Sequence, residues 1–328
     1  MPFPSDALID VHAHFVTENY IAAARAAGIA HPDGMPAWPT WSTPDHLDLM
    51  DRGEIQMSFL SVSSPGTHFG DDRAARLLSR DVNEYAARIR DEHPTRFGFF
   101  ASLPMPDIEG SLREAAYSMD TLGADGIAVE TNHGGSYLGD ALYKPLWQAL
   151  DAASAVVFVH PTSPPHADAV SLGRPRPMLE FMFDSARAAG DLVFNGVLTR
   201  YPRIQWVFTH GGGALPLLAD RMELFRQGLR IGAAEGDAPF VTVQEQLRTV
   251  WFDMAGTPFP NQIPALVRAV GTERLLYGSD YCWTPPALAQ AQISAIDAAP
   301  HPSATDTWRT LTTRNANRLL KRLALRHV

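Results

Sequence analysis

The sequence predicts an α/β protein: a distorted (β/α)8 TIM barrel, formed by a single domain over residues 1–328. Two observations predict this fold: short apolar runs recur eight times, and helical stretches separate them. Each run is too continuous to alternate with polar residues, which is typical of parallel strands buried on both faces. The runs are Leu8–His14, Met57–Ser63, Phe97–Leu103, Gly126–Asn132, Val156–Thr162, Gln205–Gly211, Thr249–Ala255 and Leu275–Tyr281.

The segments between these runs have the apolar spacing of helices. Arg73–Glu92 is amphipathic, and Ile108–Leu122 begins after a Pro-Asp pair and stops at Gly123. Eight repeats favour a closed barrel over a doubly wound sheet, and no glycine-rich nucleotide-binding motif follows a strand. The other expected helices are Ala141–Ser154, Met178–Arg200, Leu215–Arg230, Asn261–Val270 and Thr305–Arg326.

Two segments interrupt the regular alternation. Ile29–Pro44 is rich in Gly, Pro and Trp, and we expect an ordered insertion after the first strand and its helix, in the manner of a lid. Pro161–Pro177 is rich in proline, and we expect a long loop after the fifth strand. Loops at the carboxyl ends of barrel strands are where active sites are assembled.

Composition excludes several classes of protein. The formal net charge of −9 argues against a nucleic-acid partner, which needs a basic surface. No apolar run approaches the roughly 20 residues of a membrane span, and Met1–Asp6 has no signal-peptide pattern. The single cysteine, Cys282, excludes an intrachain disulfide and fits a reducing compartment, so we expect a cytoplasmic protein.

The first strand ends in a pair of histidines, His12 and His14. Residues i and i+2 of a strand project from the same face, so both imidazoles should point the same way at the strand's carboxyl end. Two adjacent imidazoles suit a transition metal such as zinc. The structural alternative, two polar residues at a strand end, is weaker for a His-x-His pair than for a lone histidine.

Three more strands end in a residue that can do chemistry. His160 follows the fifth run, His210 precedes three glycines after the sixth, and Asp280 follows the eighth. Taken singly, they could be an edge histidine, part of a glycine turn and a helix cap. Because the carboxyl ends of barrel strands meet at one mouth, the set predicts a metal-dependent active site in which Asp280 ligates metal or moves protons.

These motifs resemble the amidohydrolase superfamily. The closer resemblance is to its amidohydrolase 2 branch of nonoxidative decarboxylases, which includes α-amino-β-carboxymuconate-ε-semialdehyde decarboxylase and γ-resorcylate decarboxylase. It covers nearly the whole chain. The stretches Arg96-Phe97-Gly98-Phe99-Phe100-Ala101 and Leu122-Gly123-Ala124-Asp125-Gly126 look most like the 6-methylsalicylate decarboxylase-type members.

The resemblance implies a ligand set for one divalent metal, zinc with manganese as the alternative, and no organic cofactor. The ligands would be His12, His14, His160 and Asp280, and His210 would act as an acid/base group beside them. The fourth run ends Val129-Glu130-Thr131-Asn132-His133, without the lysine that bridges two metals in many hydrolytic relatives. The resemblance also implies a homodimer or homotetramer.

Three functions are open on these residues. The first is decarboxylation of an ortho-hydroxybenzoate, for example 6-methylsalicylate, to CO2 and a phenol, with the proton delivered by Asp280 or by His210 through it. The second is hydrolysis of a lactone, ester or amide by a metal-activated water. The third is a metal-binding scaffold without activity. The absent bridging lysine and the resemblance favour the first.

Four residues are candidate substrate contacts. Arg221, on the helix after His210, resembles an arginine that reaches the substrate carboxylate of a neighbouring subunit, although a solvated helix arginine is an equal alternative. Phe15, His68 and Trp283 follow strands and could line the pocket or simply pack. No equivalent of a second substrate arginine occurs in 30–51, which favours an aromatic monocarboxylic acid over a dicarboxylate.

Overall fold

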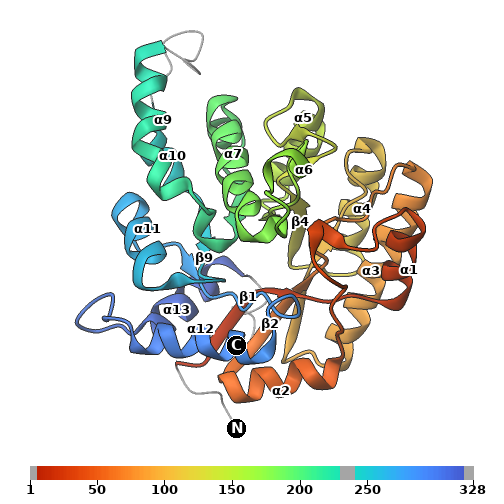
Figure 1. The fold of residues 1–328 in the computed structure, drawn as a ribbon, viewed down its shortest axis with the longest axis horizontal. Coiled ribbons are helices and arrows are strands. Elements are labelled where there is room, and N and C mark those ends of the chain that lie inside the picture. Colours follow the sequence, from red (N-terminus) through yellow and green to blue (C-terminus); the bar gives the residue numbers. More distant parts are fainter. Residues whose placement is uncertain (1–5, 230–240, 321–328) are drawn as a thin grey trace.

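The computed structural model describes residues 6–229 and 241–320. Eight parallel strands form one sheet in the order β1-β2-β3-β4-β7-β8-β9-β10 (Figure 1). Beyond the last strand, the backbone nitrogen of Val11 donates to the carbonyl of Tyr277 at 3.0 Å, and this contact closes the barrel. The predicted (β/α)8 barrel is confirmed. The strands are β1 Leu8–His14, β2 Ile55–Ser61, β3 Phe97–Ser102, β4 Gly126–Glu130, β7 Val156–His160, β8 Gln205–Phe208, β9 Trp251–Asp253 and β10 Leu275–Leu276.

Helices cover the outside of the barrel (Figure 1). Those that correspond to expected helices are α3 Asp72–Glu92, α4 Ile108–Asp120, α5 Lys144–Ala152, α7 Glu180–Phe194, α8 Val197–Arg200, α9 Leu215–Leu229, α11 Ile263–Val270 and α13 Trp308–Leu319. One expected helix, Met178–Arg200, is divided into α7 and α8 by a turn at Gly196, where φ is 66°. Two expected helices reach beyond the described residues: Leu215–Arg230 at Arg230, and Thr305–Arg326 at 321–326.

Five further α-helices lie in the described residues. They are α1 Glu18–Ala26, α2 Thr43–Gly53, α6 Ala167–Val170, α10 Val243–Leu247 and α12 Pro286–Ala298. The small hairpin of β5 Asn132–His133 and β6 Ser136–Tyr137 follows β4. Within residues 6–229 and 241–320, no helix combines the length and the apolar composition that a bilayer crossing demands.

The insertion between α1 and α2 is ordered, as expected. Its only helical turn among the described residues is η1 Pro32–Gly34. Trp38 is buried, donates from Nε1 to the carbonyl of Ile29 at 3.1 Å, and lies 5.9 Å from the Trp283 ring. The insertion therefore packs against the segment between β10 and α12, at the barrel mouth.

The barrel interior is filled by aromatic rings. Phe59, Phe100 and Phe158 stack in sequence, with centroids 5.6 Å and 5.2 Å apart. The ring of His12 meets Phe158 edge-on at 5.2 Å, one layer closer to the mouth. Such close packing holds side chains in fixed rotamers, so the interior gives His12 a rigid floor.

A buried carboxylate on α7 fixes the connection after β4. Asp184 is fully buried and accepts hydrogen bonds from Thr131 Oγ1, from Asn132 Nδ2 at 3.0 Å and from the hydroxyl of Tyr137. The guanidinium of Arg187 donates to it at 2.6 Å. Thr131, Asn132 and Tyr137 belong to the β4–β6 segment, so Asp184 joins this part of the mouth to α7.

We expect Asp184→Ala to lower the free energy of unfolding by about 3 kcal/mol, because several buried donors lose their acceptor. Chemical denaturation measures this loss. Arg187→Gln is the matched control. The Arg187 side chain is half exposed, so the loss of its ion pair with Asp184 should cost less than about 1 kcal/mol. Equal losses in the two variants would contradict a role for the buried hydrogen bonds.

Candidate active site

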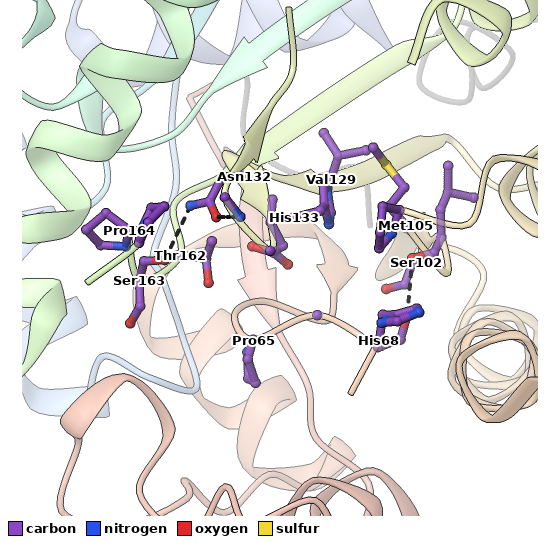
Figure 2. A pocket seen from close by; sticks show the side chains of 18 of the residues that line it. Pro65, His68, Ser102, Met105, Val129, Asn132, His133, Thr162, Ser163 and Pro164 are labelled. Carbon is purple, nitrogen blue, oxygen red and sulfur yellow. Dashed lines mark hydrogen bonds between the residues drawn. The ribbon is translucent and has the colours of Figure 1, made fainter. Parts of the chain in front are cut away.

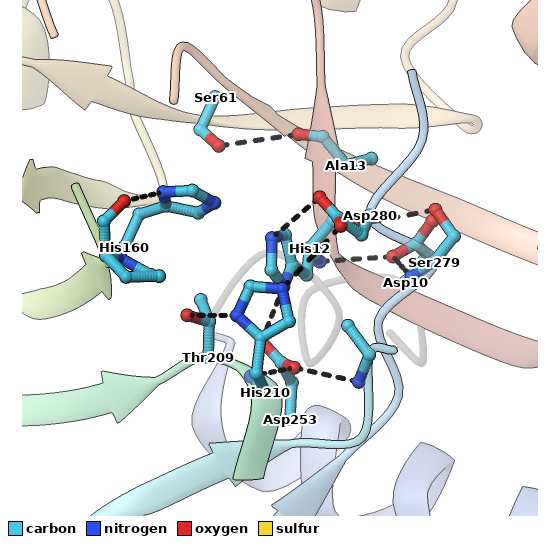
Figure 3. A network of polar contacts seen from close by, with 12 residues as sticks. Asp10, His12, Ala13, Ser61, His160, Thr209, His210, Asp253, Ser279 and Asp280 are labelled. Atoms are coloured by element: carbon cyan, nitrogen blue, oxygen red, sulfur yellow. Dashed lines mark hydrogen bonds and ion pairs between the residues drawn. The ribbon is translucent and has the colours of Figure 1, made fainter. Parts of the chain in front are cut away.

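Four predicted ligands meet at one point of the barrel mouth. Figure 3 labels three of them, His12, His160 and Asp280. One ligand atom from each of His12, His14, His160 and Asp280 lies within 4.8 Å of the others. The two Nε2 atoms of His12 and His14 are 2.9 Å apart, and Asp280 Oδ1 lies 3.5 Å and 3.3 Å from them. The expected convergence of β1, β7 and the segment after β10 is confirmed.

The histidine rings are oriented for metal binding. His12 Nδ1 donates to Asp253 Oδ2 at 2.9 Å, His14 Nδ1 lies 3.2 Å from the carbonyl of Ser61, and His160 Nδ1 lies 2.7 Å from that of Pro161. Because carboxylates and carbonyls only accept, each Nδ1 carries a proton, and Nε2 is the ring nitrogen that faces the centre. Three imidazoles and a carboxylate fit a divalent transition metal, so these four side chains form a metal-binding site.

Electrostatics keeps two of the ligands neutral and one protonated. Burial lowers the pKa of His14 and holds that of His160 well below its ordinary value. Burial opposes charge on His12 as well, but the carboxylates of Asp253 and Asp280 raise its pKa to about 10. Burial would raise the pKa of Asp280, yet hydrogen bonds with the histidines hold it well below its usual range. A metal therefore has to displace a proton from His12.

His210 stands beside the ligand set, next to Asp280. Its Nε2 lies 3.6 Å from Asp280 Oδ2, and its Nδ1 lies 3.1 Å from Thr209 Oγ1. Both His210 and Asp280 have a left-handed backbone, with φ of 53° and 57°, which is uncommon for residues other than glycine and clusters at functional sites. The pair places an imidazole nitrogen against Oδ2 of Asp280, whereas His14 lies near Oδ1.

Steric constraints on the backbone explain why glycine follows His210. A Cβ on Gly213 would lie 2.1 Å from the carbonyl oxygen of Met182, and φ is 62° there. No other residue fits this approach of the turn to α7. The three-glycine motif is thus explained by backbone packing that carries His210 to the mouth.

Two buried carboxylates that were not predicted from the sequence position the residues of the site. Asp253, fully buried at the end of β9, accepts from the backbone nitrogens of His210 and Ala255 at 2.9 Å each, in addition to His12. Asp10, also fully buried, accepts from the backbone nitrogens of His12 at 3.1 Å and Ser279 at 3.0 Å. Burial raises the pKa of Asp10 to about 6. A carboxylate inside an otherwise apolar run is the signal that could have identified both.

A cavity of about 500 Å³ opens over the centre. One wall is apolar, and none of the lining residues that the structure describes is a lysine or arginine. Trp283, a predicted contact, is among them. The lining residues are Asp33, Met35, Ser63, Ser64, His160, Pro177, Met178, Phe181, Met182, His210, Ala255, Gly256, Thr257, Gln262, Asp280, Trp283, Thr284, Pro285 and Leu288.

His68 lies in a neighbouring pocket instead. Figure 2 shows this pocket, of about 720 Å³, between the loops that follow β2, β3, β4 and β7. His68 Nε2 is 2.8 Å from Asp72 Oδ1 there. Glu130 and His133 line the same pocket. Among the residues that the structure describes, Glu130 Oε2 and His133 Nε2 are buried without a hydrogen-bond partner, and Glu130 Oε2 lies 3.8 Å from His160 Nδ1.

The last two predicted contacts lie away from both pockets. Phe15 is 2% exposed and stacks on Tyr85 at 5.7 Å, which is a core position. Arg221 is exposed on α9, with its guanidinium 4.8 Å from the Phe225 ring centroid. Within this chain, neither residue is among those that line the cavity over the centre.

The protonation of His12 generates a pH prediction. Between about pH 6 and pH 8, below the pKa of about 10, the affinity for Mn2+ should rise about tenfold per pH unit, because one proton leaves for each metal bound. Competition with a chelator measures it. In Asp253→Asn the main carboxylate partner of His12 is gone, so the dependence should flatten and the affinity should fall about 10- to 100-fold. A pH-independent affinity in the unaltered protein would contradict the assignment.

Comparison with curated proteins finds decarboxylases. The chain is 36% identical over 292 residues to decarboxylase yanB of Aspergillus niger, covering 84% of this chain and 77% of that protein. It is 35% identical over 285 residues to 6-methylsalicylic acid decarboxylase of Penicillium expansum, covering 84% of this chain and 85% of that one.

Comparison with solved structures finds the same fold. A crystal structure described as amidohydrolase II superposes with a TM-score of 0.88 at 30% identity, covering 96% of this chain and 99% of that one. The 5-carboxyvanillate decarboxylase of Sphingomonas paucimobilis superposes with a TM-score of 0.84 at 21% identity, covering 96% and 98%. The family model described as amidohydrolase matches residues 9–322, and the chain belongs to the amidohydrolase family.

Proposed function

We propose that the chain is a metal-dependent, nonoxidative decarboxylase of ortho-hydroxybenzoates, of the 6-methylsalicylate type, and that it releases CO2 and a phenol. The observation that carries the proposal is the Asp280–His210 pair, which faces a partly apolar cavity beside a single-metal ligand set. The similarity to the 6-methylsalicylic acid decarboxylase of Penicillium expansum supports the same reaction. We further propose that the chain works as one domain, 1–328, in the cytoplasm.

The protein's own residues supply the proton and hold the ring. The bound metal would supply positive charge to the carboxylate and the neighbouring phenol oxygen of the substrate. Met178, Phe181 and Leu288 line the cavity and would pack against the ring and exclude water. A proton carried by His210, whose Nε2 lies 3.6 Å from Asp280 Oδ2, would pass through the Asp280 carboxylate to the ring carbon that bears the substrate carboxylate. The carbon–carboxylate bond then breaks, its electron pair returns to the ring, and CO2 leaves.

Zinc is the metal that we propose. Three imidazoles and one carboxylate form a donor set that zinc favours, and the end of β4 carries Glu130 rather than a bridging lysine, which supports a single ion. Manganese is the competitor: a dihydroxybenzoic acid decarboxylase of Polaromonas, 22% identical, has been solved with bound manganese.

An exposed apolar surface on α7 and α9 supports a homodimer, or a homotetramer made of two dimers. On α9, Leu217, Leu224 and Leu229 are 79%, 66% and 65% exposed, and Phe183 of the contacting α7 is 49% exposed. Grouped side chains of this kind mark association surfaces. Arg221 lies on the same helix, and we propose that in the dimer it reaches the substrate carboxylate bound in the other subunit.

We expect metal-loaded enzyme to release CO2 and a phenol from 6-methylsalicylate or 2,6-dihydroxybenzoate, measured in a panel of salicylates. His210→Gln should keep its metal but lose about 10²- to 10⁴-fold in kcat, because the proton route is interrupted. Asp280→Asn should abolish release and weaken metal binding as well. No CO2 from any member, together with turnover of aryl lactones or esters, would replace the proposal with the hydrolase alternative.

The dimer proposal predicts a change in mass. Leu224→Glu on α9 should halve the molar mass measured by light scattering, because a charge is placed in the apolar contact. Leu77→Glu, at a side chain of matching 65% exposure on α3, is the control and should leave the mass unchanged. An unchanged mass in Leu224→Glu would place the subunit contact elsewhere.

A further inference from the structure

The insertion after β1 brings a carboxylate into the cavity over the metal-binding site. Asp33 lies in η1 and lines this cavity together with Asp280 and Trp283. Its Oδ1 accepts a hydrogen bond from Ser163 Oγ at 2.5 Å, across to the loop after β7. No second substrate arginine was found in 30–51, whereas the structure places a group of opposite charge in this part of the chain.

The position of Asp33 is built into the fold. Its backbone is left-handed, with φ of 51° and ψ of 26°, a conformation in which aspartate and asparagine are over-represented. The next residue, Gly34, has a φ of 74°, a backbone conformation that favours glycine. Buried Trp38 anchors the other side of the insertion. The carboxylate is therefore held at the cavity wall.

The surroundings of Asp33 disfavour a second anion. Burial raises the pKa of Asp33, while hydrogen bonds from Ser163 and Ser64 oppose the rise. Glu130 lines the neighbouring pocket, and burial, followed by the charge of Asp33, raises the pKa of Glu130 well above its ordinary value. Arg176 lies nearby, but its Nη2 donates to Asp168 and it does not line the cavity. A substrate carboxylate on this side would meet carboxyl oxygens and no lining cation among the residues described.

We propose that Asp33 determines substrate specificity by rejecting acids with a second carboxylate. The substrate class is then an aromatic monocarboxylate whose other substituents are apolar or donate hydrogen bonds, such as methyl or hydroxyl. The inference rests on the proposed function, since it assumes that the acid binds in this cavity. It deepens that function by assigning the exclusion of dicarboxylates to one side chain.

The test compares two acids in the metal-loaded enzyme: 6-methylsalicylate, with one carboxylate, and 4-hydroxyisophthalate, with two. Asp33→Asn removes the charge and keeps an acceptor for Ser163. We expect kcat/KM for 4-hydroxyisophthalate, relative to that for 6-methylsalicylate, to rise at least about tenfold in this variant. The reason is that repulsion between two like charges several ångströms apart in a partly buried site is lost. The same ratio of binding affinities, measured by calorimetry, should rise in parallel.

Two further variants keep the test decisive. Asp33→Gly also removes the carboxylate and tolerates the left-handed backbone, so it replaces Asp33→Asn if that variant does not fold. Asp48→Asn, on α2, makes the same change in net charge at an exposed side chain that pairs with Arg52, and it should leave the ratio unchanged.

The outcomes separate the inference from the proposed function. If the unaltered enzyme decarboxylates 6-methylsalicylate but Asp33→Asn leaves the ratio unchanged, the specificity role is overturned and the function stands. If no salicylate is decarboxylated, the function fails, and binding of the two acids decides the inference. The specificity role is supported if the unaltered protein binds the dicarboxylate more weakly than the monocarboxylate and Asp33→Asn removes this difference. It is overturned if the unaltered protein binds both acids equally.

Discussion

Asp253 accepts hydrogen bonds from the ring of His12 and from the backbone nitrogen of His210, so one buried carboxylate positions a metal ligand and the neighbouring proton carrier together. Such a carboxylate is costly to bury unless its oxygens are paired, and three donors pair it here. The hydrogen bond from His12 Nδ1 to Asp253 also determines that Nε2 of His12 faces the metal-binding site. The ligand geometry, the raised pKa of His12 and the place of His210 all depend on this contact.

The barrel could be predicted because its strands are buried on both faces, which leaves apolar runs that end where the chain reaches the mouth. Strand lengths were less predictable. The eighth run was expected to continue to Tyr281, but β10 is only Leu275–Leu276, and the rest follows β1 through isolated bridges at Tyr277 and Tyr281. Helices α2 and α12 were missed because prolines at their first turns resemble loop signals, although proline is compatible with a helix start.

The metal ligands could be predicted for a related reason: each follows an apolar run, and barrel geometry brings the ends of such runs together. Substrate contacts depend on loops, whose conformations are set by contacts distant in sequence. Asp33 reaches the cavity only because its insertion packs beneath Arg176 and beside Trp283, and His68 enters the neighbouring pocket because its own loop turns toward Asp72. No local pattern records these placements.

The stacked rings of Phe59, Phe100 and Phe158 have a consequence for how substrate and products move. They fill the barrel beneath His12. The cavity over the metal-binding site is lined on the mouth side by Asp33 of the insertion and by Pro285 and Leu288 at the start of α12. Substrate and products therefore pass the insertion. Changes to the insertion would therefore alter how quickly the site empties as well as what it admits.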